Sequence, residues 1–123
     1  MPVFKASDHP QFDFGGNTIT GLASPSRGTT ENAMFRAELP PGGSIPRHRH
    51  DHEDLFAVIA GAGSVTIGQE ESPLEMGDVV LVPTGQWHQV VAGEGGIGLL
   101  VAMLGGTRTY LEDGTDRVPP WVS

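Results

Sequence analysis

The chain has 123 residues, a length that predicts a single domain with its own hydrophobic core. It contains no cysteine, which excludes thiolate catalysis, a disulfide scaffold and cysteine-ligated zinc. Fifteen acidic and seven basic residues give a formal net charge of −8, which argues against nucleic-acid and anionic-membrane partners because Lys and Arg supply most contacts to both.

The N-terminal segment lacks a basic region followed by an apolar run, so no signal peptide is predicted. The longest apolar stretch, residues 97–104, is too short to span a bilayer. We therefore expect a soluble, cytoplasmic protein.

Glycine and proline punctuate the whole chain. The 18 glycines and 10 prolines separate short apolar runs, a pattern that predicts many short strands and no helix. Turns are expected at 61–63 and 93–96, and the tail 112–123 is expected to be irregular. About eight to ten short strands in one domain, residues 1–123, predict an all-β sandwich or barrel. The expected strands cover residues 12–14, 18–22, 33–39, 44–50, 54–60, 64–68, 79–82, 87–92, 97–104 and 107–111.

Histidines and carboxylates crowd the middle of the chain. His48, His50 and His52 lie two residues apart, and Asp54 follows in the same phase. Residues two apart on a strand face the same side, so His48 and His50 can chelate one ion together. His88 follows a Pro-x-Gly turn on a later strand and supplies another imidazole. Imidazole and carboxylate ligands at one centre predict a mononuclear site for one divalent transition metal, such as Fe, Mn, Zn or Ni.

Two motifs in this region resemble those of the cupin family. The family's first motif combines a Gly, an HxH pair, a Glu and a Gly, and residues 42–61 carry it as Gly42, His48, His50, Asp54 and Gly61. The second motif combines a Gly, a Pro-x-Gly, a His and an Asn, and residues 77–92 carry it as Gly77, Pro83, Gly85, His88 and Ala92. The resemblance implies a double-stranded β-helix, or jelly-roll, barrel with a metal inside near one open end. It also implies a ligand set of His48, His50 and His88, with Asp54 as the matched fourth.

Asp54 and Ala92 depart from the family's motifs. Asp is one methylene shorter than Glu, which leaves three possibilities for Asp54. It contacts the metal directly, it acts through a bridging water, or it contacts only the ligands of a three-histidine centre. Glu53, which is out of phase, and His52, which lies at the turn, are the alternatives for completing the site. Ala92 removes the Asn side chain and leaves space in the barrel wall.

Phase also predicts the residues that line the pocket. Phe56, Val58, Val90 and Ala92 share the phase of the ligands, as does Gln86. A wall this apolar suits a small, partly apolar ligand, although ordinary filling of a barrel gives the same pattern. Arg36 would meet an anionic substrate if its face turned inward, but the opposite face of its strand is the more apolar one.

The resemblance implies a small metalloenzyme that acts on a small organic or sugar-acid-like substrate by dioxygenase or isomerase/lyase chemistry. The candidate general bases are Glu53, His52 and, more distantly, Glu38. Because these candidates are few, dioxygenation or metal-enolate chemistry is favoured over a two-base mechanism. The alternatives are a non-catalytic, metal-dependent module that binds or senses a small ligand, and a metal with a purely structural role. Resemblance to small cupins also implies a homodimer in which N-terminal strands pair across subunits.

Overall fold

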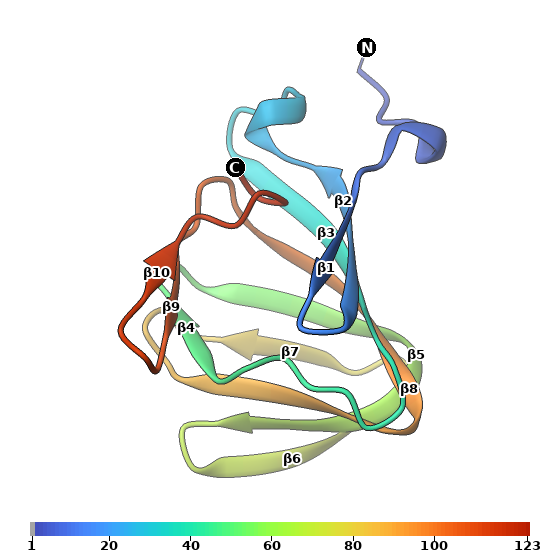
Figure 1. Cartoon of the computed structure of the whole chain (residues 1–123), viewed down its shortest axis with the longest axis vertical. Helices are drawn as coiled ribbons and strands as arrows, with labels where there is room; N and C mark the ends of the chain where they lie inside the picture. Colours follow the sequence, from blue (N-terminus) through green and yellow to red (C-terminus); the bar gives the residue numbers. More distant parts are fainter. Residues whose placement is uncertain (1) are drawn as a thin grey trace.

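Strands form most of the computed structural model, which describes residues 2–123 (Figure 1). This part of the chain contains ten strands and two single-turn 3-10 helices, η1 (Ala6–Asp8) and η2 (Pro25–Arg27). The expected all-β class is confirmed. Among the described residues, no helix is long and apolar enough to cross a bilayer, and the cytoplasmic location stays a prediction. The strands are β1 (Gln11–Phe14), β2 (Asn17–Ala23), β3 (Asn32–Leu39), β4 (His48–His50), β5 (Asp54–Ile67), β6 (Glu70–Glu75), β7 (Val79–Val82), β8 (His88–Leu104), β9 (Thr109–Leu111) and β10 (Asp116–Arg117).

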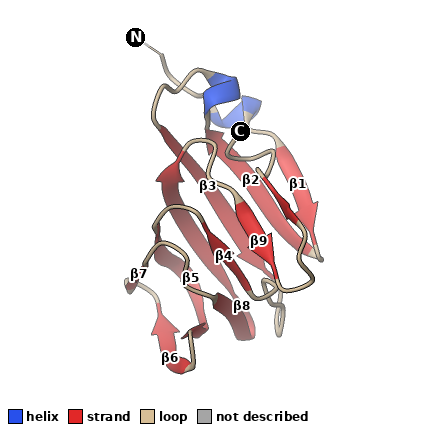
Figure 2. Cartoon of the chain, turned by 90° about the vertical axis from the view of Figure 1, so that its left-hand side faces the viewer, coloured by secondary structure: helices blue, strands red, loops and turns tan. Residues whose placement is uncertain are grey.

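Two layers of strands enclose the core (Figure 2). The C-terminal part of β8 pairs with β3 and with the first half of β5, while its N-terminal part pairs with β4 and with the second half of β5. One layer therefore runs β1-β2-β3-β8-β5-β7, and the other runs β10-β9-β4-β8-β5-β6. This is the jelly-roll arrangement that the resemblance implied. The inward-facing side chains that fill the core include Phe35, Ala37, Leu39, Phe56, Val58, Leu99 and Val101.

The two long strands, β5 and β8, pass through both layers and pair antiparallel along their length. β5 has 14 residues and β8 has 17, so the prediction of chain-reversing turns at 61–63 and 93–96 is wrong. Both segments are bends within continuous strands, and the β5–β8 register shifts between Gly61 and Gly63. Glycine marks a corner of a curved strand here, because a strand can bend sharply where no side chain must be placed.

Gly61 is required at this corner for two reasons. Its φ is +69°, a conformation that L side chains rarely adopt. A Cβ added to it would also collide with the carbonyl oxygen of Gly96 on the neighbouring strand. Gly95, one residue earlier on β8, has open space around its Cα and no positive φ.

Replacing Gly61 by Ala is expected to destabilise the protein by at least about 2 kcal/mol, because the backbone of both strands must shift. The matched control, Gly95→Ala, is expected to change stability by no more than about 0.5 kcal/mol. Urea unfolding of the two variants measures the difference. Equal stabilities would contradict the role given to the corner.

The C-terminal tail closes one end of the barrel. Trp121 is buried and packs against Phe12, Phe14 and Phe35, with ring centroids 5.6–6.2 Å apart. The tail was expected to be irregular, but it contributes the short strand β10, which pairs with β9. The tail thus joins β1 and β3 of one layer to the β9–β10 hairpin of the other.

Candidate metal centre

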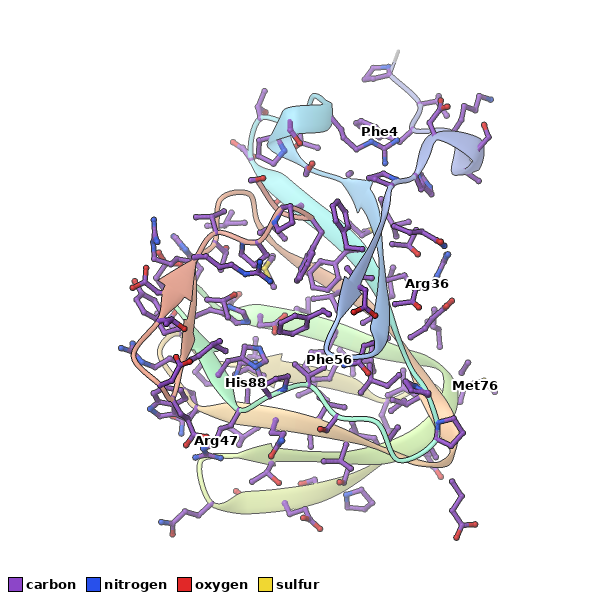
Figure 3. All side chains as sticks on the ribbon, viewed as in Figure 1. Phe4, Arg36, Arg47, Phe56, Met76 and His88 are labelled. Carbon is purple, nitrogen blue, oxygen red and sulfur yellow. The ribbon has the colours of Figure 1, made fainter. Side chains whose placement is uncertain are left out.

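Three imidazoles meet where β4 and β8 pair inside the barrel. His48 and His88 are direct partners across the two strands, and His50 lies on the same face of β4. The ring centroids are 4.2–5.3 Å apart, and the candidate ligand nitrogens lie within 4.8 Å of one another. All three side chains are buried, and Figure 3 shows His88 inside the barrel. The register of the sheet thus brings together two motifs that are distant in the sequence.

Backbone carbonyls orient two of the three rings in the same way. Nδ1 of His48 lies 2.6 Å from the carbonyl oxygen of Pro46, and Nδ1 of His88 lies 2.9 Å from that of Gln86. A carbonyl oxygen only accepts, so each Nδ1 carries the proton and donates it. In the neutral ring each Nε2 then carries the lone pair, which is the state of a histidine that can bind a metal.

Thr109 orients the third ring. It lies opposite His50 in the β4–β9 pairing, and its Oγ1 is 3.2 Å from Nδ1 of His50. The hydroxyl serves as the acceptor when Nδ1 carries the proton, and Nε2 of His50 then also keeps a free lone pair. No pattern in the sequence marked Thr109, because its role depends on the register between two three-residue strands.

A buried carboxylate lies beside the histidines. Asp54, the first residue of β5, is 5% exposed, and its Oδ2 lies 3.5 Å from Nε2 of both His50 and His88. Burial raises the pKa of Asp54, but hydrogen bonds and charge attraction from His50 and His88, which act when these rings carry a proton on Nε2, outweigh burial and lower the pKa to about 2. Asp54 is therefore ionised at neutral pH and brings a negative charge to the centre.

Two polar atoms of the centre have no partner among the described residues. Oδ1 of Asp54 and Nε2 of His88 are buried, and neither makes a hydrogen bond within residues 2–123. Leaving such groups unpaired costs on the order of 1–3 kcal/mol each, and more for a charged group. A divalent cation contacting the imidazoles and the carboxylate would satisfy both atoms. The donor set therefore fits a transition metal with nitrogen and oxygen ligands.

The free energy of unfolding of the metal-free protein is expected to decrease as the pH is lowered, because of His48. Burial lowers the pKa of His48 from 6.5 to about 3, and His88 and His50 act in the same direction. The unfolded chain takes up this proton near pH 6.5, whereas the folded chain excludes it until about pH 3. The loss is about 2 kcal/mol between pH 6.5 and pH 4.5. Urea unfolding across this range measures it, and a His48→Gln variant with an unchanged pH dependence would contradict the assignment.

An apolar cavity of about 260 Å³ opens beside the histidines. Pockets for drug-sized ligands are roughly 300–1,000 Å³, so this one suits a compact molecule. The three histidines and Asp54 form one polar part of its wall. The hydrophobic part of the wall consists of Phe14, Ile19, Phe35, Ile45, Phe56, Val90, Leu99, Val101, Met103, Leu111, Pro119 and Trp121.

The pocket residues predicted from strand phase fall into two groups. Phe56 and Val90 line the cavity, and Figure 3 shows Phe56 inside the barrel. Val58 and Ala92 are also buried, but they belong to the hydrophobic core and do not line the cavity. Phase predicts the face of a strand correctly, but it does not predict how far along the strand the cavity extends.

Gln86 and Arg36, which phase placed in or near the pocket, do not line the cavity beside the histidines. Gln86 is exposed, because it precedes β8 and the alternation counted back from His88 does not apply there. Arg36 lies on the outer face of β3, where its Nε is 3.2 Å from Oε1 of Glu38 (Figure 3). The opposite face of the strand supplies Phe35 to the cavity instead.

The two candidate general bases also lie outside the cavity wall. His52 and Glu53 occupy the turn between β4 and β5. Nδ1 of His52 lies 2.9 Å from Oδ1 of Asp51, and Glu53 is exposed. Glu38 is likewise exposed on β3. None of the three candidates lines the cavity beside the centre.

Seven cavity residues near the C-terminus were missed, namely Thr109, Leu111, Thr115, Asp116, Arg117, Pro119 and Trp121. Thr109, Asp116 and Arg117 come from the β9–β10 hairpin, and Trp121 comes from the tail. Strands of two or three residues are too short to show a periodic pattern, and nothing local in the sequence indicates that β9 pairs with β4 or that β10 pairs with β9.

Comparison with known proteins agrees with this geometry. Residues 35–104, more than half of the chain, match the family described as Cupin domain. The chain is 38% identical over 94 residues to gentisate 1,2-dioxygenase of Ralstonia sp., a match that covers 71% of this chain and 26% of that protein. It is 33% identical over 89 residues to the tetracenomycin polyketide synthase protein TcmJ of Streptomyces glaucescens, covering 72% of this chain and 60% of that protein. The chain thus spans only part of the length of these relatives.

Solved structures show the same fold. The polyketide cyclase RemF from Streptomyces resistomycificus superposes with a TM-score of 0.73 at 22% identity, covering 85% of this chain and 79% of that one. Salicylate 1,2-dioxygenase from Pseudoaminobacter salicylatoxidans superposes with a TM-score of 0.72 at 22% identity, covering 84% of this chain and 31% of that one. The resemblance found in the two motifs is confirmed, and this chain belongs to the cupin family.

Proposed function

We propose that this protein is a mononuclear metalloenzyme that acts on a small, largely apolar organic molecule, with dioxygenation as the favoured reaction. The observation that carries this proposal is the buried three-histidine cluster at the wall of an apolar cavity of about 260 Å³. His48, His50 and His88 would hold the metal, and Asp54 would complete the ligand set. A bound divalent metal supplies Lewis-acid chemistry there or, if it is iron, activation of dioxygen.

The shortage of free acid–base groups in the cavity wall supports dioxygenation over isomerase or lyase chemistry. Within the described wall, the titratable side chains beyond the centre are Asp116 and Arg117. Asp116 accepts a hydrogen bond of 2.6 Å from Arg108, so it is already paired. A two-base mechanism therefore has few groups to use. The mostly hydrophobic wall also favours an apolar substrate over a sugar acid, and the similarity to a gentisate 1,2-dioxygenase supports oxygen chemistry.

Oxygen uptake tests the proposed reaction. Protein loaded with Fe(II) is expected to consume oxygen with at least one member of a panel of hydroxylated aromatic acids. The His48→Ala/His50→Ala variant is expected to reduce this rate to background. Saturable binding without turnover would instead support the second candidate, a non-catalytic metal-dependent binding or sensor module, which the same shortage of acid–base groups favours.

We also propose that the protein is a homodimer, with the outer face of β3, β8, β5 and β7 as the contact. Met34, Ala102, Leu55 and Leu81 lie in register across these four strands. Leu55 is 44% exposed and Leu81 is 53% exposed, and an exposed apolar row of this kind supports association. The N-terminal strands, which were expected to pair across subunits, extend the sheet of their own chain through β3.

The Leu55→Glu/Leu81→Glu variant is expected to convert the dimer to a monomer near 13 kDa, because two charges would be buried without partners at the contact. Light scattering measures the mass. A wild-type monomer would contradict the proposal, and so would a variant that remains dimeric.

A further inference from the structure

Arg117, an exposed residue of β10, lines the cavity and has no carboxylate partner among the described residues. Arg117 is the only Lys or Arg among the cavity-lining residues of the described chain. Within residues 2–123 no ion pair involves Arg117, whereas the adjacent Asp116 is paired with Arg108 at 2.6 Å. The protein as a whole carries a net charge of −8, which repels anions. Arg117 therefore gives the cavity a local positive charge that can attract an anionic group.

Two aromatic rings hold the Arg117 guanidinium in place. Its Cζ lies 5.7 Å from the ring centroid of Phe14 and 5.5 Å from that of Trp121, and both rings line the cavity. A cation–π contact is an attraction between the charge of the guanidinium and the face of the ring, so the N–H donors that do not point at a ring stay available for a ligand. These donors match the two oxygens of a carboxylate in geometry.

The sheet register sets the distance between Arg117 and the metal centre. Arg117 is the partner of Thr109 across β10 and β9, and Thr109 is the partner of His50 across β9 and β4. All three residues line the cavity. Two inter-strand spacings separate the backbones of Arg117 and His50, which is roughly 10 Å. A molecule with one ring and a polar group at each end is of a size to bridge the two side chains.

We propose that Arg117 is a specificity-determining residue that binds the carboxylate of an aromatic monocarboxylate. The ring of this ligand packs against Phe14, Phe56 and Trp121, and the oxygen at its other end faces the three histidines. The inference rests on the proposed function for the role of the histidines, and it adds the residue that recognises the carboxylate of the ligand. It also assigns recognition to the β9–β10 hairpin, which lies outside both histidine motifs.

A matched pair of probes tests this inference. The first probe is 4-hydroxybenzoate, and the second is 4-hydroxybenzamide, which keeps the shape and loses the charge. At pH 7.5 the wild-type protein is expected to bind the carboxylate about tenfold more tightly than the amide, as a charge-assisted hydrogen bond at a partly exposed site provides. Titration calorimetry measures both affinities, and quenching of tryptophan fluorescence in a Trp87→Phe background, where Trp121 is the remaining tryptophan, reports ligand in the cavity.

The Arg117→Gln variant is expected to bring the ratio of the two affinities close to one and to leave the affinity for the amide unchanged. Arg117→Lys is expected to retain part of the preference. The matched control is Arg36→Gln, which removes the same charge from the outer face of β3 and is expected to keep the wild-type ratio. Thermal unfolding of each variant shows that the fold is intact.

The outcomes separate this inference from the proposed function. Measured on metal-free and on Zn²⁺-loaded protein, a ratio that depends on Arg117 in both states supports the inference even if no turnover is found. A wild-type protein that binds the amide as tightly as the carboxylate would overturn it. An unchanged ratio in Arg117→Gln, with metal binding and turnover intact, would also overturn it while leaving the proposed function in place.

Discussion

The His88→Ala variant is expected to bind divalent transition metal well over 100-fold more weakly than the wild-type protein. Loss of a hydrogen-bond partner to a metal ligand lowers affinity by about 10–100-fold, and loss of a ligand itself has a larger effect. His88 is 1% exposed and is the only one of the three histidines that comes from β8. Competition titration with a chromogenic chelator measures the affinity.

The matched control for this variant is His52→Ala. His52 belongs to the same sequence cluster, but its side chain lies at the turn beside Asp51 and does not line the cavity. Its removal is expected to leave metal affinity within about twofold of wild type, as is usual for a surface substitution with a small energetic effect. A loss in His52→Ala equal to that in His88→Ala would place the metal at the turn instead.

The Asp54→Asn variant is expected to lower metal affinity by at least about 100-fold, the upper limit for an outer partner of a ligand. The substitution keeps the shape of the side chain and removes the charge. In the wild type this carboxylate is ionised, buried and 3.5 Å from two imidazole nitrogens, and its Oδ1 has no partner within the described chain. A cation is the partner that such a group lacks.

Two further variants test whether the effect of Asp54→Asn comes from losing the carboxylate at this position. Asp54→Glu restores the residue of the family motif and is expected to keep most of the affinity. Glu53→Gln changes the charge of the exposed neighbour and is expected to have no effect. If Asp54→Asn binds metal as tightly as wild type, Asp54 has no role in binding, and the site is a three-histidine centre alone.

The first two histidines of the site could be found from the sequence because their relation is local. His48 and His50 are two apart on one strand, so they share a face whatever the rest of the chain does. His88 could be added because the Pro-x-Gly turn before it belongs to a second motif of the family. Asp54 was identified by its place in the first motif, and the structure puts it beside His50 and His88.

The rest of the site could not be predicted because it depends on contacts that are distant in the sequence. Thr109 and Arg117 reach the cavity through the pairing of β4, β9 and β10. Strands were predicted at 44–50 and 107–111, but their pairing and the two-residue strand β10 leave no local signal in the sequence. In the sequence, the bends at Gly61 and Gly96 cannot be told from hairpin turns, because both kinds of structure use a glycine with positive φ. Only the continuous pairing of β5 with β8 shows that the chain bends at these glycines and does not reverse its direction.

Elemental analysis of the protein purified without added metal tests the central claim most directly. The wild-type chain is expected to carry close to one equivalent of a divalent transition metal, and the His48→Ala/His50→Ala variant is expected to carry almost none. Circular dichroism of both proteins shows whether the strands are retained. A folded wild-type protein with no more metal than the folded variant would contradict the metal centre.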